Sequence, residues 1–235
     1  MARPFDAGAA LAGSGRHSAG LPTLAVRNPQ GVFSEIIAQL DVPLAAPSAN
    51  RSGSVSPTTA AAVAESLQDR VTLVLDGGPC SVGVESAIVK VEGDKVFLLR
   101  PGGLPRADIE RVTGRKLQKP DAQAAVQAPG MLKSHYAPEA AVRLEVTELH
   151  RGEALLAFGA QRAKGYENAV ALLNLSPAGN MEEAASNLFS YLHALDRPDI
   201  AAIAVEPIPY TGLGEAINDR LQRAAAPRAQ NCPAG

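Results

Sequence analysis

The sequence contains little cysteine, and this limits the kinds of site it can build. Its two cysteines, Cys80 and Cys232, lie far apart, with no Cys-x-x-Cys spacing and no group of histidines around them. This pattern argues against a zinc site and against a disulfide scaffold. Free cysteines are typical of a reducing compartment, so we expect a cytoplasmic protein with no bound metal.

The sequence also lacks a charge imbalance and a long apolar run. Twenty-two basic and 24 acidic residues leave a formal net charge of −2, so no global basic field attracts nucleic acid. No apolar stretch approaches the roughly 20 residues that span a bilayer, and the first residues lack a basic-then-apolar signal pattern. With 235 residues, 46% of them hydrophobic, the chain is expected to form one large or two small soluble domains away from membranes.

The most informative local feature is a polar loop at residues 46–58. An apolar run at 42–46 predicts a buried strand before it, and a Pro-Thr-Thr sequence with a following Ala-rich run predicts a capped helix over 60–67. The hydroxyls of Ser48, Ser52, Ser54 and Ser56 and the amide of Asn50 can donate hydrogen bonds into one small volume. Together with free N–H groups at the helix start they would suit a phosphate. The alternative is an ordinary polar loop with a helix cap, since no Gly-Lys-Ser/Thr sequence is present.

Hydrophobic periodicity predicts two α/β halves around a linker. In the first half we expect strands at 23–27, 71–75, 86–91 and 95–100, the last two as a hairpin around Glu92-Gly93-Asp94, and helices at 32–40 and 108–113. In the second half we expect strands at 154–158, 169–175 and 200–205, and helices at 181–195 and 214–225. The second alternation is typical of a small parallel sheet flanked by helices, with the apolar stripe of the 181–195 helix in the core.

Five separated motifs give the chain a recognisable pattern. They are Ser-Ala-Asn-Arg-Ser-Gly at 48–53, Val-Glu-Ser-Ala-Ile-Val at 84–89, Leu-Arg-Pro-Gly at 99–102, Ala-Pro-Gly-Met at 128–131 with Ser-His-Tyr-Ala-Pro at 134–138, and Gly-Leu-Gly-Glu-Ala-Ile-Asn-Asp-Arg-Leu at 212–221. In order and spacing they resemble the YrdC-type threonylcarbamoyl-AMP synthases, in the long two-domain form. The resemblance covers about residues 22–228.

The resemblance implies an α/β fold in three parts. They are a YrdC-like twisted open sheet at 1–116, truncated at its N-terminus, a linker at 117–139, and a small Rossmann-like parallel α/β domain at 140–235. It further implies a nucleotidyltransferase that makes threonylcarbamoyl-AMP and pyrophosphate from L-threonine, bicarbonate and ATP, with Mg²⁺ accompanying ATP. The product would serve threonylcarbamoyladenosine modification of tRNA, so RNA or tRNA-modification proteins are possible partners.

The resemblance also assigns binding residues. Contacts to ATP are implied for Arg3, Thr23, Ser48, Asn50, Ser56, Arg100 and Tyr136. Contacts to threonine are implied for Arg27, Ala46 and Ser86. No catalytic residue is assigned, because both reacting groups are anionic and the task is to position them and neutralise their charge.

Several of these residues also have a simpler interpretation. Arg100, at a strand end before Pro-Gly-Gly, suits a phosphate but could instead form a surface salt bridge, and Arg27 could be a solvated charge. Tyr136 is expected to close over the nucleotide as a lid, or with His135 to anchor the linker. Glu85 would either orient Ser86 or pair with an arginine.

The beginning of the sequence departs from the family pattern. The family has a Pro-Thr-Glu-Thr-type motif and then a Lys-x-Arg-Pro motif, whereas here Met1 stands at the lysine position before Ala2-Arg3-Pro4. We therefore expect a chain truncated inside the second motif, with part of the pocket absent and activity reduced or lost. The alternative function is a noncatalytic double-stranded RNA-binding or regulatory module, which the charge of −2 disfavours.

Overall fold

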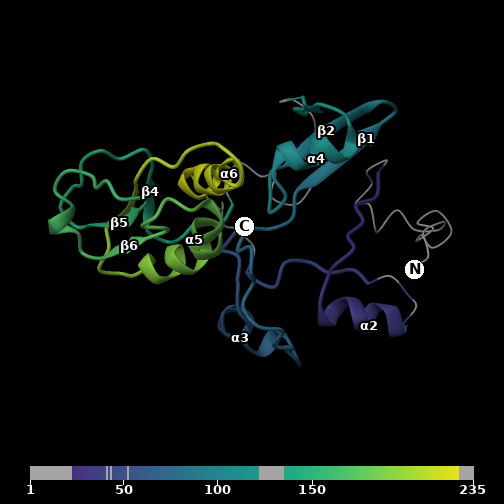
Figure 1. Cartoon of the computed structure of the whole chain (residues 1–235). Coiled ribbons are helices and arrows are strands. Elements are labelled where there is room, and N and C mark those ends of the chain that lie inside the picture. The colour runs from purple at the N-terminus through teal and green to yellow at the C-terminus, as the bar shows by residue number, and fades with distance from the viewer. Residues whose placement is uncertain (1–22, 41, 43, 52, 122–134, 228–235) are drawn as a thin grey trace, which may run out of the picture. The chain divides into compact units, whose positions relative to one another are not determined.

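The computed structural model describes residues 23–40, 42, 44–51, 53–121 and 135–227. The chain separates into two compact units, Met1–Ser48 and Ala49–Gly235, and each is described by itself. Figure 1 labels the elements of both units. The predicted nucleotide contact Arg3 lies outside the described residues.

The described part of the first unit is built around one helix. Helix α2, Val32–Leu40, forms where the sequence predicts it, with Glu35 in its first turn and no buried residue. The buried strand predicted at 42–46 is not formed among the described residues, and Val42 and Leu44 are exposed. The strand predicted at 23–27 is likewise not formed, and its Val26 is exposed. A β-strand exists only where a neighbouring strand accepts its backbone hydrogen bonds, and no described residue pairs with this segment.

The second unit begins with the polar loop and helix α3, Ala60–Leu67, followed by the 3₁₀ turn η1, Gln68–Arg70. The Thr59 hydroxyl caps α3 by accepting a hydrogen bond from the Ala62 N–H at 3.2 Å, which confirms the predicted helix start. The prediction of a strand at 71–75 is wrong, because this segment is unpaired among the described residues and Leu73 is 74% exposed.

A three-stranded sheet follows. Strands β1, Ile88–Glu92, and β2, Lys95–Arg100, form the predicted antiparallel hairpin, and β3, Leu117–Gln118, runs parallel to β2. Helix α4, Arg106–Thr113, packs Ile109 against the apolar face of β2. Residues 117 and 118, which the sequence interpretation gave to the linker, therefore complete this sheet.

The remainder of the second unit is the predicted parallel α/β structure. Its four strands are β4, Ala141–Arg143, β5, Glu153–Ala157, β6, Leu172–Asn174, and β7, Ala202–Val205. All neighbours pair in parallel, in the order β4-β7-β5-β6. The helices are the 3₁₀ turn η2, Tyr166–Asn168, with α5, Met181–Leu195, and α6, Gly214–Ala225. The sequence interpretation missed β4, which is only three residues long.

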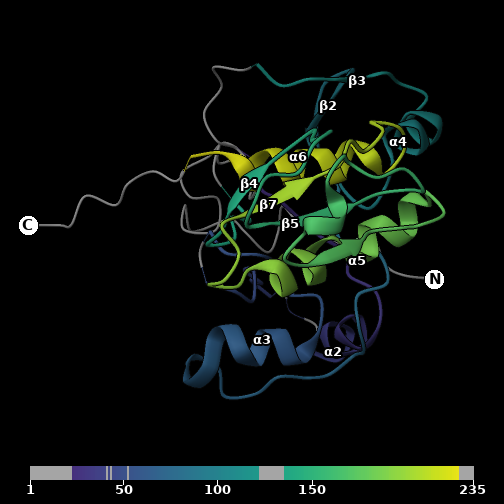
Figure 2. The ribbon, with the colours of Figure 1, turned by 90° about the vertical axis from the view of Figure 1, so that its left-hand side faces the viewer.

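Both long helices cover the same face of this sheet. Leu156 and Ile203 point into one core with Leu188 of α5 and Ile217 of α6, which confirms the apolar stripe of α5 as core. The alternate residues Leu155 and Ala204 point to the other face, where loop residues such as Val146 cover them. Figures 1 and 2 show α5 and α6 lying against the strands.

The loop before β1 packs directly on α5. Val84 belongs to the same core as Leu188, and Gly83 has a φ of +73°. A Cβ on Gly83 would lie 2.2 Å from the Ala185 carbonyl oxygen, which is too close for two atoms that are not bonded. Only glycine, which has no Cβ, fits at this position. The residue just before the motif at 84–89 thus lies in close backbone contact with helix α5.

We expect Gly83→Ala to lower the free energy of unfolding by about 3 kcal/mol, because a methyl group must displace the backbone of α5. Gly114→Ala is the matched control, since Gly114 also has a positive φ, +64°, but nothing lies within 4 Å of its added Cβ. The control should cost only about 1 kcal/mol of backbone strain. Urea denaturation of both variants measures the difference, and equal losses would contradict the close packing.

Candidate functional site

A carboxylate in the loop before β1 organises the site. Glu85 Oε1 accepts a hydrogen bond from the Ser56 hydroxyl at 2.8 Å, across 29 positions of sequence. The other oxygen, Oε2, accepts from Arg220 Nε of helix α6 at 2.7 Å. One side chain therefore joins the polar loop, the loop before β1 and the C-terminal helix.

Arg220 is fully buried, with 0% of its side chain exposed. Its Nη1 donates to Asp219 at 2.6 Å, and its guanidinium carbon lies 5.3 Å from the centre of the Tyr136 ring. Nη2 has no hydrogen-bond partner among the described residues. The aromatic face supplies part of the stabilisation that the buried cation needs.

Arg100 stands at the end of β2 and is buried. Its Nη2 donates to the Ser86 carbonyl at 2.9 Å, and the Gly103 N–H donates to the Glu85 carbonyl at 3.0 Å. A Cβ on Gly102 would lie 2.2 Å from the Ala87 nitrogen, so the turn after Arg100 fits closely against the loop. Arg100 is thus not a surface salt-bridge residue.

Tyr136 is 1% exposed and holds a left-handed φ of +60°, which is rare for a residue with a side chain. Its ring lies 5.4 Å from that of Phe189 and 4.0 Å from that of His135. The next residue, Ala137, donates its N–H to the Gly53 carbonyl at 3.0 Å. The end of the linker is therefore docked between α5 and the polar loop.

The pKa shifts follow from this burial. Burial raises the pKa of Glu85, but the Arg220 charge and the hydrogen bonds from Arg220 and Ser56 outweigh it and hold that pKa below its ordinary value. Burial and the Arg220 charge lower the pKa of Arg100. Burial lowers the pKa of His135 and raises that of Tyr136, so both rings are neutral at pH 7.

The Asn50 side chain shapes its own loop. Its Nδ2 donates to the carbonyls of Arg51 and Ser54, each at 3.0 Å, and the Arg51 N–H donates to the Ser66 hydroxyl at 3.2 Å. The Asn50 bonds hold the loop in a tight turn, and the Arg51 bond ties that turn to the last turn of α3.

The sequence-predicted residues fall into two groups. Ser56, Ser86, Arg100 and Tyr136 come together around Glu85, and Asn50 lies in the same unit. Thr23, Arg27, Ala46 and Ser48 are all exposed residues of the first unit. Ligand contacts by any of these residues remain predictions.

Comparison with known proteins decides the family. A family model described as "Threonylcarbamoyl-AMP synthase, C-terminal domain" matches residues 104–226, and one described as "Telomere recombination" matches residues 12–102. The chain belongs to the threonylcarbamoyl-AMP synthase family. Both matched segments are present, as in the two-domain Sua5 form.

Curated relatives agree with this assignment. The chain is 34% identical over 230 residues to the threonylcarbamoyl-AMP synthase of Bacillus subtilis, covering 92% of this chain. It is 35% identical over 229 residues to that of Pyrococcus abyssi, covering 89% of this chain. The chain spans 66% of the length of each of these two relatives, just under two thirds.

Solved structures of the family show the same fold. The crystal structure of P. abyssi Sua5 complexed with L-threonine superposes with a TM-score of 0.75 at 33% identity, covering 88% of this chain and 65% of that one. A variant of that protein with a histidine and a tyrosine replaced by alanine gives a TM-score of 0.73 at 31% identity. The α/β fold predicted from the family resemblance is confirmed.

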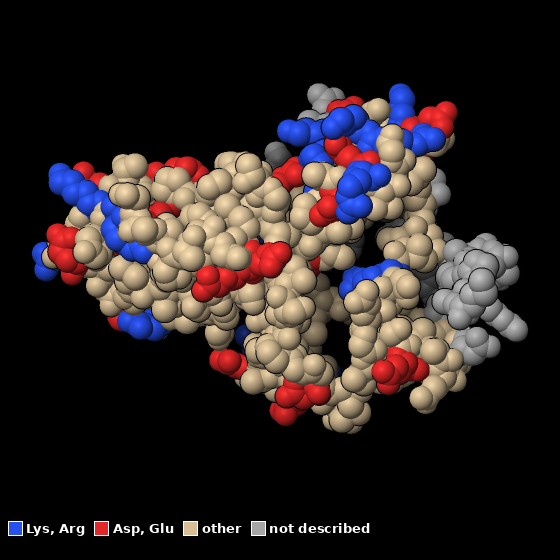
Figure 3. Space-filling view, in the orientation of Figure 1, with Lys and Arg blue, Asp and Glu red and all other residues tan. Residues whose placement is uncertain are grey.

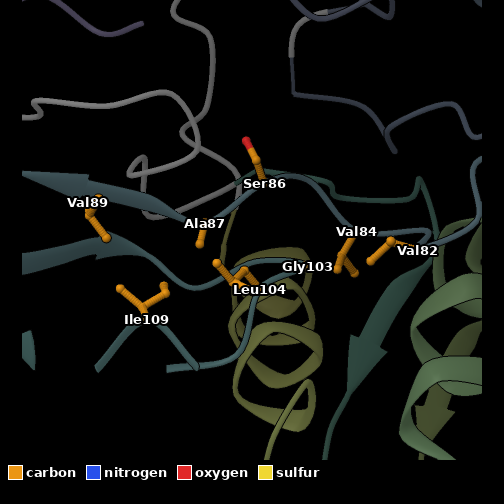
Figure 4. Close-up of a pocket in the computed structure, with 8 residues that line it drawn as sticks. All are labelled: Val82, Val84, Ser86, Ala87, Val89, Gly103, Leu104 and Ile109. Carbon is orange, nitrogen blue, oxygen red and sulfur yellow. The ribbon is translucent and has the colours of Figure 1, made fainter. Parts of the chain in front are cut away.

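An apolar cavity lies beside the loop that carries Ser86. A cavity of about 480 Å³ is lined by seven apolar residues and Ser86, and six of the seven are Val82, Val84, Ala87, Val89, Leu104 and Ile109. Figure 4 shows the Ser86 hydroxyl pointing away from this cavity while Ala87 points toward it. The cavity has no charged lining residue, so it does not suit an anionic nucleotide.

Surface charge gives no support to the RNA-binding alternative. Over the β1-β2-α4 region, Figure 3 shows basic and acidic side chains intermixed. Arg115 pairs with Asp94 at 2.8 Å and Lys116 with Glu110 at 2.7 Å. The relatives are named as synthases, which supports the enzymatic interpretation and not the RNA-binding one.

The described residues carry neither a metal-binding cluster nor a membrane-spanning helix. They contain no group of three or more His, Cys, Asp or Glu side chains placed to hold a metal ion. They also contain no helix that is long and apolar enough to cross a bilayer.

The sequence interpretation left Glu85 between two roles and assigned none to Arg220. The structure shows that Glu85 pairs with an arginine, and that the arginine comes from the motif at 212–221. The charged residues of that motif were the available signal, but their partner lies 135 positions away. Nothing in the spacing along the chain indicates such a pair.

We expect Glu85→Gln to lower the free energy of unfolding by about 3 kcal/mol at pH 7, because the buried Arg220 cation then keeps only one of its two carboxylate partners, Asp219. The folded pKa of Glu85 lies below the ordinary value of 4.5, so the stabilisation is complete above that pH. It is lost as the pH falls through the lower folded value, and the difference between variant and parent should shrink there.

Chemical denaturation between pH 3 and pH 7 measures this convergence. Glu65→Gln is the control, since it removes the same charge at a side chain that is 69% exposed. It should leave stability unchanged within about 0.5 kcal/mol. A Glu85 effect that does not vary with pH would show that the carboxylate charge is unimportant.

Proposed function

We propose that the chain forms threonylcarbamoyl-AMP and pyrophosphate from L-threonine, bicarbonate and ATP. The product would carry the threonylcarbamoyl group toward the threonylcarbamoyladenosine modification of tRNA. Family membership supports the reaction class. The observation that carries the proposal to this chain is the convergence of Ser56, Ser86 and Arg100 on Glu85 and the peptide that follows it.

The chemistry requires two bond-forming steps. The threonine amine attacks the bicarbonate carbon, forming a C–N bond with loss of water. A carbamate oxygen then attacks the α-phosphorus of ATP, and the bond from that phosphorus to the bridging oxygen breaks to release pyrophosphate. Because both partners are anionic, the protein must hold them in line and offset their repulsion.

The described residues fit this task by position and charge. Ser86 presents an exposed hydroxyl for threonine, and its peptide is held in place from behind by Arg100. Ser56 and Asn50 belong to the loop that we propose faces the nucleotide. The docked Tyr136 excludes water from this region, which would protect a labile adenylate.

Mg²⁺ is proposed to enter with ATP rather than to bind protein carboxylates. The acidic groups of the site, Glu85 and Asp219, are both engaged by Arg220 and offer no free ligand set. Magnesium is commonly held by substrate phosphates and water, and there it would offset phosphate charge. We place the protein in the cytoplasm, with tRNA-modification proteins as the users of its product.

The test is pyrophosphate release by the purified chain with ATP, Mg²⁺, bicarbonate and L-threonine. We expect release that requires both threonine and bicarbonate, with threonylcarbamoyl-AMP identified by mass spectrometry. Ser86→Ala should raise the KM for threonine roughly five- to tenfold, the cost of one lost hydrogen bond.

Ser81→Ala is the matched control, because Ser81 is an exposed serine of the same loop, five positions earlier. It should leave the KM for threonine unchanged. Isothermal titration of threonine and ATP into the chain provides a second readout. Absence of both turnover and binding would refute the proposed function for this chain.

A further inference from the structure

Helix α6 contributes a buried side chain to the site that no binding role explains. Arg220 lies on α6, Gly214–Ala225, whose inward face otherwise packs apolar residues such as Ile217 and Leu221 into the core. Burying a guanidinium costs several kcal/mol unless it is paired. Pairing with Glu85 offsets this cost at the point where α6 faces the loop before β1.

The pair leads straight to the predicted substrate contacts. Arg220 holds Oε2 of Glu85, while Oε1 of the same carboxylate holds the Ser56 hydroxyl. A carboxylate fixed on one oxygen has a restricted orientation on the other. The position of Ser56 therefore depends on Arg220, although the two residues share no direct hydrogen bond among those described.

The same pair also limits the backbone that carries Ser86. The Glu85 carbonyl accepts from the Gly103 N–H at 3.0 Å, and the Ser86 carbonyl accepts from Arg100 at 2.9 Å. Arg220, on helix α6, adds to this support through its hydrogen bond to the Glu85 side chain. Without it, the peptide that aims the Ser86 hydroxyl keeps its backbone contacts but loses its charged anchor.

A second ion pair on α6 makes it possible to distinguish positioning of the serine loops from docking of α6 onto its neighbours. Glu215 pairs with Arg106 of α4 through two hydrogen bonds, at 2.6 and 3.1 Å. Both of these side chains are more than a quarter exposed, and neither is hydrogen-bonded to Ser56, Glu85 or Ser86. The Arg106 pair joins α6 to α4 and makes no hydrogen bond to Ser56, Glu85 or Ser86, the residues of the two serine loops.

We propose that Arg220 is a positioning residue through which the C-terminal sheet and its helices hold the Ser56 and Ser86 loops in their binding arrangement. The substrate part of this inference rests on the proposed function, whereas the loop-positioning part does not. The role of the C-terminal half of the chain is then to preorganise the substrate loops from behind.

The experiment compares Arg220→Met and Arg220→Lys with Arg106→Met in the full chain. Hydrogen exchange is followed by mass spectrometry on peptides covering 53–57 and 83–87. We expect Arg220→Met to speed exchange at least tenfold in both peptides, Arg220→Lys to do so less, and Arg106→Met to leave both unchanged. Titration with L-threonine and a nonhydrolysable ATP analogue should show at least tenfold weaker binding for Arg220→Met only.

Each result has a separate meaning. Unchanged exchange in both peptides would overturn the inference whatever the binding data. Equal loss of ligand affinity in Arg106→Met would also overturn it, because docking alone would then account for the effect. Faster exchange in a chain that binds neither threonine nor the ATP analogue would refute the proposed function while supporting the positioning role. If Arg220→Met fails to fold, Arg220→Lys and Glu85→Gln give the same comparison.

Discussion

The arrangement of the site depends on the ion pair between Glu85 and Arg220, because each charged group needs hydrogen-bond partners to be stable inside the fold. A fully buried guanidinium destabilises a fold unless a carboxylate meets it with good geometry, and the carboxylate needs further donors on its second oxygen. Here the second oxygen accepts from Ser56, and the cation also faces the ring of Tyr136. Removing Glu85 or Arg220 takes one hydrogen-bond partner from the other, so these segments depend on one another.

The architecture around the pair follows from close backbone contact. Gly83 touches the backbone of α5, and Gly102 touches the segment that carries Ser86. The Gly83 contact brings a loop from the first half of the sequence onto helix α5 from the second half. A core that includes Val84 as well as Leu188 shows that the two halves share apolar burial as well as charge. The described part of the second unit is therefore stabilised as a whole.

The motifs that identify the family contain more than the proposed substrate contacts. Members of a family keep residues that bind ligands and residues that hold those residues, and a motif does not distinguish the two. The motif at 48–53 contains Asn50, whose amide bonds its own loop, and the motif at 212–221 contains Arg220, which acts on a distant carboxylate. Positioning thus accounts for motif residues that have no evident place in the chemistry.

Local pattern was sufficient for the elements whose stability is local. Helix α5, the capped helix α3 and the hairpin of β1 and β2 all follow from apolar spacing, a capping threonine and a Gly turn between two apolar runs. The strands expected at 23–27 and 71–75 failed because strand formation depends on a partner, which sequence spacing does not supply. The sequence by itself determined the family, the helices and the candidate serines. Only the tertiary structure decided which charges meet, because Glu85 and Arg220 are 135 positions apart and their pairing depends on how α6 packs.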